Sequence, residues 1–427
     1  MSSSRSSMIT ILGAVLVSGA CTRQQPNYCA TAPDHNCMEL PPSAPDASIS
    51  CSADNECEGT LVCDVSGSKK CVQCTASKSM ACTGVNPVCG SDNSCHTCTT
   101  HEQCKTNVCL PDGSCAMEAD VAYVTAGANG TNCTKDEPCG TLQDGLEQNR
   151  TYVKVAKGSV KGSTTIDHQI VTILADKGAI LTIDNSQTGK PVLEIGDQVS
   201  VQIYDLEITG ATGANGDGIQ SEKNSTLSLI HVAIHDNDGI GIRIMNGILT
   251  VDQSSIFSNK AGGIRMFTAN GGGTLFMIIN NFIYHNGSTM STVGGLSLLP
   301  VGASKLEFNT VADNTSSGST SAGGVICNQN GFVAPHNIFF RNMTGTSGNV
   351  QTFGECDMGD SLMSDTNSSL DFLRPDDTPY DYHLTSAAPT SITAAVTDAE
   401  ACTGVDFDGD SRSVGGPCAL GADQPKP

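Results

Sequence analysis

The most constraining feature of this chain is a repeat in its middle. Five short apolar segments each end on an asparagine, and the steps between these asparagines are 22, 27, 28 and 28 residues. A period of this length is typical of a solenoid, in which each repeat forms one coil and contacts only its neighbours. The asparagines that mark the period are Asn237, Asn259, Asn286, Asn314 and Asn342.

The pattern inside each repeat predicts β-strands. Every repeat holds short apolar stretches rich in Val, Ile and Leu, which Gly, Asn or Ser interrupts. No segment keeps a helical period, and the leucine framework of leucine-rich repeats is absent. Strands at the same place in successive coils must pair in parallel, so the sequence predicts an all-β parallel β-helix. Its expected inward stack is Ile234, Ile256, Ile283, Val311 and Phe339.

The asparagines fit such a coil as structural residues. Asparagine tolerates left-handed backbone angles, and its side-chain amide can hydrogen-bond to the amide of the next coil. We therefore expect Asn286, Asn314 and Asn342 to lie at sharp turns where strands end. A second column sits five residues earlier, at Asn281, Asn309 and Asn337.

The cysteine content indicates the compartment. The chain has 21 cysteines, a density rarely stable as free thiols in a reducing cytosol, so we expect an oxidising, extracytoplasmic environment. The alternative is a cytosolic zinc protein. The histidines do not sit beside the cysteine pairs as zinc ligands would, which disfavours that alternative.

The N-terminus accounts for the odd cysteine. Arg5 precedes an apolar run from Met8 to Val17, too short to span a membrane and typical of a signal peptide. Ending in "SGAC", it resembles a bacterial lipoprotein signal, although Ser18 stands where that family usually has an aliphatic residue. The resemblance implies lipidation of Cys21 and outer-membrane sorting, and a plain secreted protein is the alternative. Residues 1–20 are then the signal peptide and residues 21–50 a Pro- and Ser-rich tether.

Residues 51–116 form a second, shorter repeat. Three units of four cysteines follow one another, "CSADNECEGTLVCDVSGSKKC", "CTASKSMACTGVNPVCGSDNSC" and "CTTHEQCKTNVCLPDGSC". Units of this size cannot bury a core, so disulfides must stabilise them, with two bonds in each unit. Four cysteines permit three connectivities, and the sequence does not choose among them. A stalk is favoured over a binding module.

Three regions of residues 121–424 resemble the right-handed parallel β-helix family. "YVTAGANGTNCTKDEPCGTLQDGLEQ" is similar to its N-terminal capping segment, with a short helix opening at Thr141. The repeat itself is the second region, and "DYHLTSAAPT" with "DFDGDSRSVGGPCALGAD" is similar to its closing coils. Within this resemblance, the pairs expected for the remaining cysteines are Cys133–Cys139, Cys327–Cys356 and Cys402–Cys418.

Many members of this family degrade acidic polysaccharides, so their catalytic motifs are informative. The repeats contain neither the arginine-proline motif of pectate lyases nor the Gly-His-Gly of polygalacturonases. The Asp-Pro-His-Asp of alginate epimerases is also missing, and "RPDDTPYDYHL" has similar residues in another order within the closing region. The missing motifs favour a binding protein over an enzyme. The enzyme alternative is a polysaccharide lyase or glycoside hydrolase.

One weaker constellation remains on the repeats. Gln220, Arg243, Arg265 and Ser297 share one outward strand position, so the two arginines would stack about 5 Å apart. Such a pair is unfavourable unless an anion lies between the two charges. The expected ligand is an acidic sugar, and the alternative is a solvated face whose arginines pair with nearby acids. The loops nearby contribute Asp217, His235, Asp236 and Asp238.

"DFDGDSRS" places carboxylates at alternate positions near the C-terminus. Asp406, Asp408 and Asp410 could supply the oxygen ligands that Ca²⁺ prefers. The spacing departs from an EF-hand, because glycine stands at the fourth place and no glutamate closes the loop. The alternative is a structural turn that needs no cofactor.

The charge of the chain excludes one class of partner. Lys and Arg number 22 against 44 Asp and Glu, a net charge of −22, which disfavours binding to nucleic acid. The sequence thus predicts an exported surface lipoprotein that presents a β-helix for glycan binding or adhesion. Its expected partners are a membrane, through the lipid anchor, and a polysaccharide. A structural surface element without a ligand is a further alternative.

Overall fold

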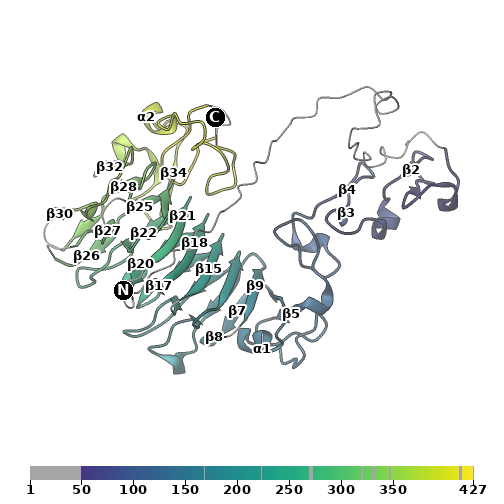
Figure 1. The fold of residues 1–427 in the computed structure, drawn as a ribbon, viewed down its shortest axis with the longest axis horizontal. Helices are drawn as coiled ribbons and strands as arrows, with labels where there is room; N and C mark the ends of the chain where they lie inside the picture. Colours follow the sequence, from purple (N-terminus) through teal and green to yellow (C-terminus); the bar gives the residue numbers. More distant parts are fainter. Residues whose placement is uncertain are drawn as a thin grey trace, which may run out of the picture. The chain divides into compact units, whose positions relative to one another are not determined.

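The computed structural model describes residues 50–167, 169–222, 224–268, 273–318, 321–328, 332–345, 348–412 and 416–426. The signal peptide, Cys21 and nearly all of the tether lie outside the described residues. The chain forms two compact units (Figure 1). The first comprises the first two cysteine-rich units except residues 83–88, and the second contains residues 83–88 and 96–427.

Each cysteine-rich unit, called a module below, has the same disulfide connectivity. The first cysteine bonds to the third and the second to the fourth, a choice that the sequence left open. The six disulfides are Cys51–Cys63, Cys57–Cys71, Cys74–Cys89, Cys82–Cys95, Cys98–Cys109 and Cys104–Cys115. The elements of the modules are η1 (Asp54–Glu56), β1 (Val62–Cys63), β2 (Cys71–Val72), η2 (Ala76–Ala81), β3 (Val88–Cys89), β4 (Cys95–His96) and η3 (His101–Gln103).

The third module packs against the first coils of the solenoid. Val108 is fully buried, and it forms a small cluster with Val121, Tyr123 and Leu174 of the solenoid. The hydroxyl of Tyr123 donates a hydrogen bond of 2.7 Å to the carbonyl of Thr106. These contacts place the third module in the same compact unit as the solenoid, although its cysteine pattern matches the other two modules.

The solenoid is an all-β parallel β-helix with three sheets, as the repeat predicted. From β6 to β24, successive strands belong to the three sheets in turn, and neighbouring coils pair in parallel (Figure 1). Sheet 1 contains β5 (Val121–Val124), β6 (Tyr152–Val155), β9 (Ile170–Ala175), β12 (Ser200–Tyr204), β15 (Ser225–Ile230), β18 (Gly247–Asp252), β21 (Thr274–Ile279) and β24 (Lys305–Glu307).

The other two sheets follow the same rule. Sheet 2 contains β7 (Gly158–Lys161), β10 (Ala179–Thr182), β13 (Glu207–Thr209), β16 (Ala233–His235), β19 (Ser255–Phe257), β22 (Phe282–Tyr284), β25 (Thr310–Ala312), β28 (Ile338–Phe340) and β32 (Leu362–Ser364). Sheet 3 contains β8 (Thr164–Ile166), β11 (Leu193–Ile195), β14 (Ile219–Ser221), β17 (Ile240–Met245), β20 (Gly262–Phe267), β23 (Leu296–Leu298), β27 (Val325–Cys327) and β31 (Thr352–Gly354).

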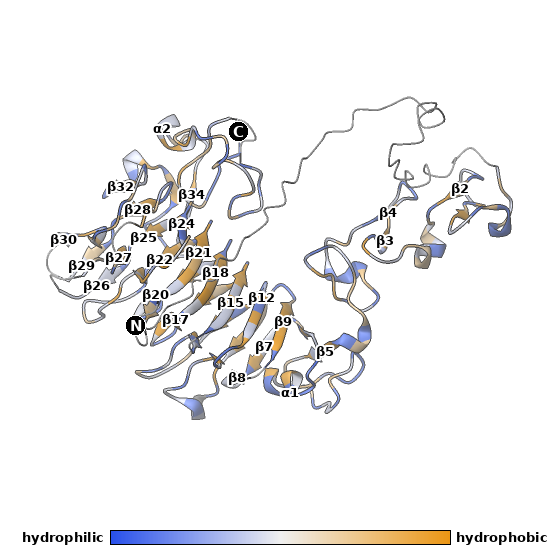
Figure 2. Ribbon diagram, viewed as in Figure 1, coloured by the Kyte–Doolittle hydropathy of each residue, from blue (hydrophilic) through white to orange (hydrophobic). Residues whose placement is uncertain are grey.

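The core of the solenoid is a set of stacked aliphatic columns. Burying such side chains contributes about 25 cal/mol for each Å² of apolar surface removed from water. Figure 2 shows how apolar residues concentrate in the strands. The expected inward stack is confirmed, since its members are register partners in sheet 2 and at most 1% exposed: Ile234, Ile256, Ile283, Val311 and Phe339.

Two buried asparagine ladders line the turns. The Nδ2 atom of Asn286 donates to Oδ1 of Asn314 at 3.0 Å, and Nδ2 of Asn314 donates to Oδ1 of Asn342 at 2.9 Å. The left-handed angle falls one residue earlier than the sequence suggested, with φ values of 53° at His285 and 53° at Asp313. The asparagines therefore serve as inward hydrogen-bonding groups. The second ladder is Asn281, Asn309 and Asn337.

A short helix caps the first coils. The helix α1 (Leu142–Glu147) begins where the sequence predicted, and the side chain of Thr141 accepts a hydrogen bond from the backbone N–H of Asp144. Leu142 and Leu146 bury its inner face. Cys133 and Cys139 form a disulfide in the loop between β5 and this helix. The short helix η4 (Glu118–Asp120) precedes β5.

The C-terminal residues form a closing segment against sheet 2. They bury an apolar cluster on the outward side of β22, β25 and β28 that includes Phe282, Phe340 and Tyr382. Disulfides join Cys327 to Cys356 and Cys402 to Cys418. The remaining elements are η5 (Asn185–Gln187), β26 (Thr315–Ser316), β29 (Met343–Thr344), β30 (Gly348–Asn349), η6 (Asn367–Ser369), β33 (Phe372–Arg374), β34 (Asp381–Leu384) and α2 (Thr390–Thr393).

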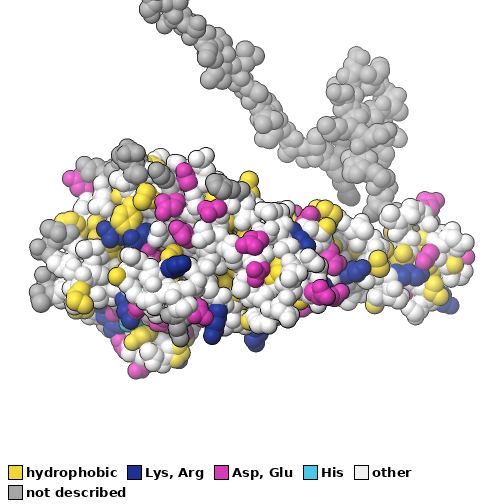
Figure 3. Space-filling model, turned by 90° about the horizontal axis from the view of Figure 1, so that it is seen from below, with side chains coloured by type: hydrophobic (Ala, Val, Ile, Leu, Met, Phe, Trp, Pro, Cys, Tyr) yellow, Lys and Arg dark blue, Asp and Glu magenta, His cyan; other side chains and the backbone are white. Residues whose placement is uncertain are grey.

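Within the described part of the chain, no helix is long and apolar enough to cross a membrane. On the face seen in Figure 3, acidic side chains are spread among uncharged ones, and Lys and Arg occur singly or in small groups. The described cysteines form nine disulfides, which is typical of proteins in oxidising compartments outside the cytoplasm.

Candidate functional site

Four polar side chains form one outward column on sheet 3. The register pairs Gln220 with Arg243, Arg243 with Arg265, and Arg265 with Ser297. Because neighbouring strands lie about 4.8 Å apart, the two arginines are direct neighbours on the sheet surface. This column, called the arginine face below, has the composition that the repeat period predicted.

Arg243 is paired with a buried carboxylate. Its Nε atom lies 2.5 Å from Oδ2 of Asp217, and one terminal nitrogen lies 3.2 Å from Oδ1. The side chain of Asp217 is fully buried and also accepts a hydrogen bond of 2.7 Å from the backbone N–H of Ile240. Burial raises the pKa of Asp217, although Arg243 opposes the shift. The acid therefore neutralises one of the two arginines and holds it in place.

Arg265 has no such partner. No carboxylate of the described residues lies within ion-pair distance of its guanidinium group, which sits 4.3 Å from the centre of the Phe267 ring. The guanidinium of Arg243 lies 5.5 Å from the same ring. Burial and the charge of Arg243 lower the pKa of Arg265, although Asp217 opposes the shift. Among the described residues, the arginine face thus keeps one positive charge that is not paired with a carboxylate of its own.

The other candidate residues lie on or beside sheet 2. The two ring nitrogens of His235 contact Glu207 at 3.1 Å and Asp236 at 2.8 Å, and its ring stacks on Phe257 with centroids 4.5 Å apart. Asp238 pairs with Lys260 at 2.6 Å. The structure thus brings Asp217 to the arginines, but it engages His235, Asp236 and Asp238 elsewhere. The expected single cluster of all these residues does not form.

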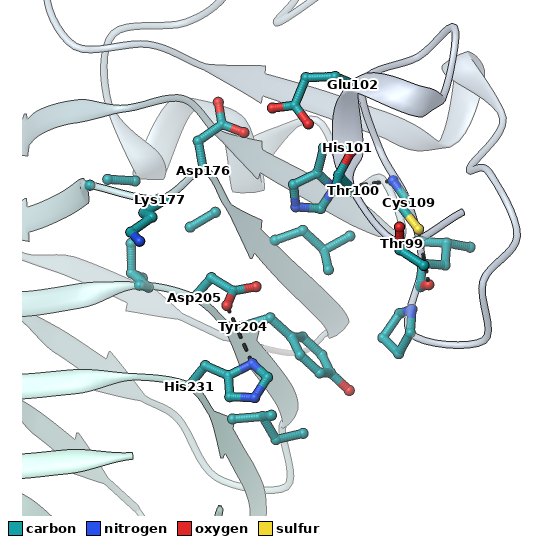
Figure 4. A pocket seen from close by; sticks show the side chains of 18 of the residues that line it. Thr99, Thr100, His101, Glu102, Cys109, Asp176, Lys177, Tyr204, Asp205 and His231 are labelled. Atoms are coloured by element: carbon teal, nitrogen blue, oxygen red, sulfur yellow. Dashed lines mark hydrogen bonds and ion pairs between the residues drawn. The ribbon is translucent and has the colours of Figure 1, made fainter. Parts of the chain in front are cut away.

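A hollow of about 1000 Å³ lies between the third module and the solenoid (Figure 4). Asp205 and His231 occupy successive coils, and their side chains are 3.3 Å apart. The hydrogen bond to Asp205 raises the pKa of His231. No sequence period marks this hollow, because the module that closes it lies outside the repeat. The acidic residues that line it are Glu102, Asp176, Asp205 and Glu207.

A buried cation lies beside this hollow. Lys154 is 4% exposed, and its Nζ atom lies 2.6 Å from Oδ1 of Asp176. Burial lowers the pKa of Lys154, although the ion pair with Asp176 opposes the shift. Lys154 is already paired with Asp176. The other acidic residues that line the hollow still make it unfavourable for an anionic ligand.

The three C-terminal aspartates do not assemble into the expected calcium site. The Oδ1 atom of Asp406, which is fully buried, accepts the backbone N–H groups of Asp408 and Asp410 at 3.0 and 2.8 Å. Asp410 pairs with Lys426 at 3.0 Å. Asp406 is therefore a structural turn residue, and Asp408 turns instead toward His383. The alternating spacing produced a hydrogen-bonded turn because backbone donors used the first carboxylate.

Comparisons with known proteins give no family for this chain. No family model matches it, and no curated protein matches it. The solved structures with a similar fold include pectate lyase Pel9A, with a TM-score of 0.43 and 14% identity, covering 72% of this chain and 96% of that one. A catalytic domain of a GH87 alpha-1,3-glucanase in complex with tetrasaccharides has a TM-score of 0.34 and 14% identity, covering 62% and 50%.

At these TM-scores neither likeness carries an argument about what this chain binds or does. The fold is assigned from this chain's own structure, which has three sheets of parallel strands, an aliphatic core and two asparagine ladders. By its own strand pairing, the chain is a parallel β-helix protein that carries disulfide-rich modules at its N-terminal side.

Proposed function

We propose that the arginine face binds an acidic glycan. The observation that carries the proposal is the difference between the two arginines. Arg243 has a buried carboxylate partner, whereas Arg265 lies half-buried beside it with no carboxylate within reach among the described residues. A carboxylate or sulfate group of a glycan would supply the missing counter-charge through bidentate hydrogen bonds.

The surroundings of Arg265 favour an anionic ligand over an empty face. The ion pair with Asp217 holds Arg243 in place, and the Phe267 ring lies close to both guanidinium groups. Cation–π contacts of this kind hold the planar groups in a defined orientation. A ligand then meets donors that have already lost part of their side-chain entropy, which lowers the cost of binding.

The solenoid suits a linear polymer because successive coils present equivalent positions about 4.8 Å apart. Gln220 and Ser297 flank the two arginines in the same column, and Gln220 adds a neutral hydrogen-bonding group, whereas Ser297 is buried and accepts a hydrogen bond from Asn328. A chain molecule that lies along the sheet can thus contact several coils at once. The acid-lined hollow beside the third module is a poorer place for an acidic glycan.

Binding is favoured over catalysis because the nearest acid, Asp217, and the nearest base, His235, are both held by other residues. Asp217 is fully buried and already bound to Arg243 and to the N–H of Ile240, so it is poorly placed to take a proton from a substrate. His235 belongs to sheet 2 and is held by Glu207 and Asp236. The alternative, a polysaccharide lyase or hydrolase, needs a base that approaches the arginine face.

The test is a calorimetric titration with a uronic-acid oligosaccharide. We expect Arg265→Ala to weaken binding by about 1–3 kcal/mol, the range for charge-assisted hydrogen bonds, and added salt to weaken wild-type binding. Lys305→Ala is the control, because Lys305 is an exposed cation of sheet 1 that pairs with Glu307. Equal affinities of wild type and Arg265→Ala would refute the proposal. Release of reducing ends or unsaturated products would instead favour the enzyme.

The proposal includes presentation at the cell surface. The nine described disulfides fit an extracellular location. The lipoprotein-like sequence around Cys21 supports a lipid anchor in the outer membrane, with residues 21–50 as a tether that holds the modules and the solenoid away from the lipid.

A further inference from the structure

Three potential metal ligands converge in the closing segment, away from the arginine face. They are the Nε2 atom of His383 on β34, a carboxylate oxygen of Asp408 in the turn that follows Val405, and a carboxylate oxygen of Asp423 near the C-terminus. These three atoms lie within 4.8 Å of one another. They come from segments far apart in sequence, so no local turn explains why they meet.

The orientation of His383 is set by a fourth residue. The Nδ1 atom lies 2.6 Å from Oδ1 of Asp381 and donates its proton to that carboxylate. With the proton held on Nδ1, the lone pair of Nε2 points toward Asp408 and Asp423.

The Nε2 atom is buried and makes no hydrogen bond among the described residues. It lies 3.3 Å from Oδ2 of Asp408. The rings of Phe282 and Phe407 pack against His383, with centroids 4.7 and 5.7 Å away, and cover part of its surface. A cation bound between this nitrogen and the two carboxylates would stabilise the group, because a buried polar atom without a partner is unfavourable.

The carboxylate of Asp423 is the buried member of the group. The residue is 6% exposed, and its Oδ2 atom accepts a hydrogen bond of 2.7 Å from the backbone N–H of Leu384. That bond fixes the carboxylate and leaves Oδ1 available. The side chain of Asp408 is 47% exposed, so one side of the group stays open to solvent and to an entering ion.

We propose that His383, Asp408 and Asp423 form a binding site for a divalent transition metal, with Zn²⁺ as the type ion. One imidazole nitrogen and two carboxylate oxygens are a ligand set that suits Zn²⁺, with water in the fourth position, whereas Ca²⁺ prefers oxygen alone. The Asp381–His383 pair supplies the second-shell carboxylate that orients metal-binding histidines. A bound ion ties β34, the turn after Val405 and the C-terminus together.

The test uses the whole oxidised protein, stripped with a chelator and without an affinity tag, and titrates Zn²⁺ by calorimetry. We expect one saturable site that Asp408→Asn and His383→Gln both remove. Asp381→Asn should weaken binding about 10- to 100-fold, because it disturbs only the orienting hydrogen bond. His336→Gln is the matched control, since His336 pairs with Asp360 at 2.8 Å in the solenoid.

Thermal unfolding gives a second readout. Zn²⁺ should raise the unfolding midpoint of wild type and of His336→Gln, and leave that of Asp408→Asn unchanged, because an ion that binds only the folded state stabilises it. Asp408 is half exposed, so this variant is expected to fold. No saturable binding by wild type, or equal binding by Asp408→Asn, overturns the proposal. In that case His383 contacts Asp408 directly, without an ion between them.

Discussion

At the level of single residues, the buried asparagines show how a solenoid satisfies polar groups inside its wall. Asn314 is fully buried and uses its whole amide. Its Nδ2 atom donates to the carbonyl of Ile283 and to Asn342, at 2.8 and 2.9 Å. Its Oδ1 atom accepts the backbone N–H and the Nδ2 of Asn286, at 2.9 and 3.0 Å. No aliphatic side chain of similar volume can replace these bonds.

We therefore expect Asn314→Ala to destabilise the solenoid strongly. The change leaves buried groups of Asn286 without a partner, which costs on the order of 3 kcal/mol of unfolding free energy. Denaturant unfolding followed by circular dichroism measures this value. Asn129→Ala, at an exposed position in the N-terminal capping loop, is the control and should change stability by less than about 0.5 kcal/mol. A cost below that of the control would show that the ladder is dispensable.

At the level of elements, the modules and the solenoid are stabilised in different ways. The buried cluster of the first module consists of Cys51, Cys63 and Cys71, with Cys57 and Leu61 packed beside them. Its core is thus mostly its own disulfides. The solenoid instead buries a continuous set of aliphatic side chains across all three sheets. The third module is intermediate, because Val108 and Ala116 join a cluster with residues of the solenoid.

Reduction should therefore unfold residues 51–95 and leave the solenoid folded. Each lost disulfide costs about 2–5 kcal/mol in a small domain without another core, whereas the solenoid keeps its apolar burial. Hydrogen exchange with and without a reductant measures this, with the oxidised protein as the control. We expect protection to vanish in the first two modules and to persist in sheets 1–3. A single transition that unfolds both regions together would contradict this division.

At the level of the whole molecule, the chain combines a strongly anionic composition with the local cationic surface of the arginine face. The net charge of −22 repels polyanions over most of the surface. Binding an acidic glycan then requires the short-range contacts of Arg265, and it should depend steeply on ionic strength. An anionic protein and an anionic membrane repel each other, so in the proposed arrangement the lipid on Cys21 supplies the attachment.

Cys21→Ser is expected to release the protein from membranes. A single modified residue carries the proposed anchor, and the substitution removes the sulfur to which the proposed lipid is attached. Fractionation of cells that express wild type and variant, with metabolic acyl labelling, measures the effect. If the wild-type protein never takes up the acyl label, the anchor proposal is wrong and the chain is a secreted protein.

The repeat period, together with the apolar pattern inside each repeat, predicted the parallel β-helix, the inward stack from Ile234 to Phe339 and the column that contains Arg243 and Arg265. A side chain's place on a solenoid follows from its position within the repeat, and that position can be counted along the chain. The position of α1 was predicted from its resemblance to a capping segment. The left-handed turn residues were misassigned by one position, because periodicity locates a turn without saying which residue bears the positive φ.

Contacts between segments without a shared period needed the three-dimensional structure. The third module closes a hollow against the solenoid, and Asp408 joins His383 and Asp423. The disulfide connectivity of the modules likewise needed the three-dimensional structure. Spacing along the chain determines which residues can share a strand position. Long-range packing determines which charged side chains pair, because these contacts join segments that are not separated by the repeat period.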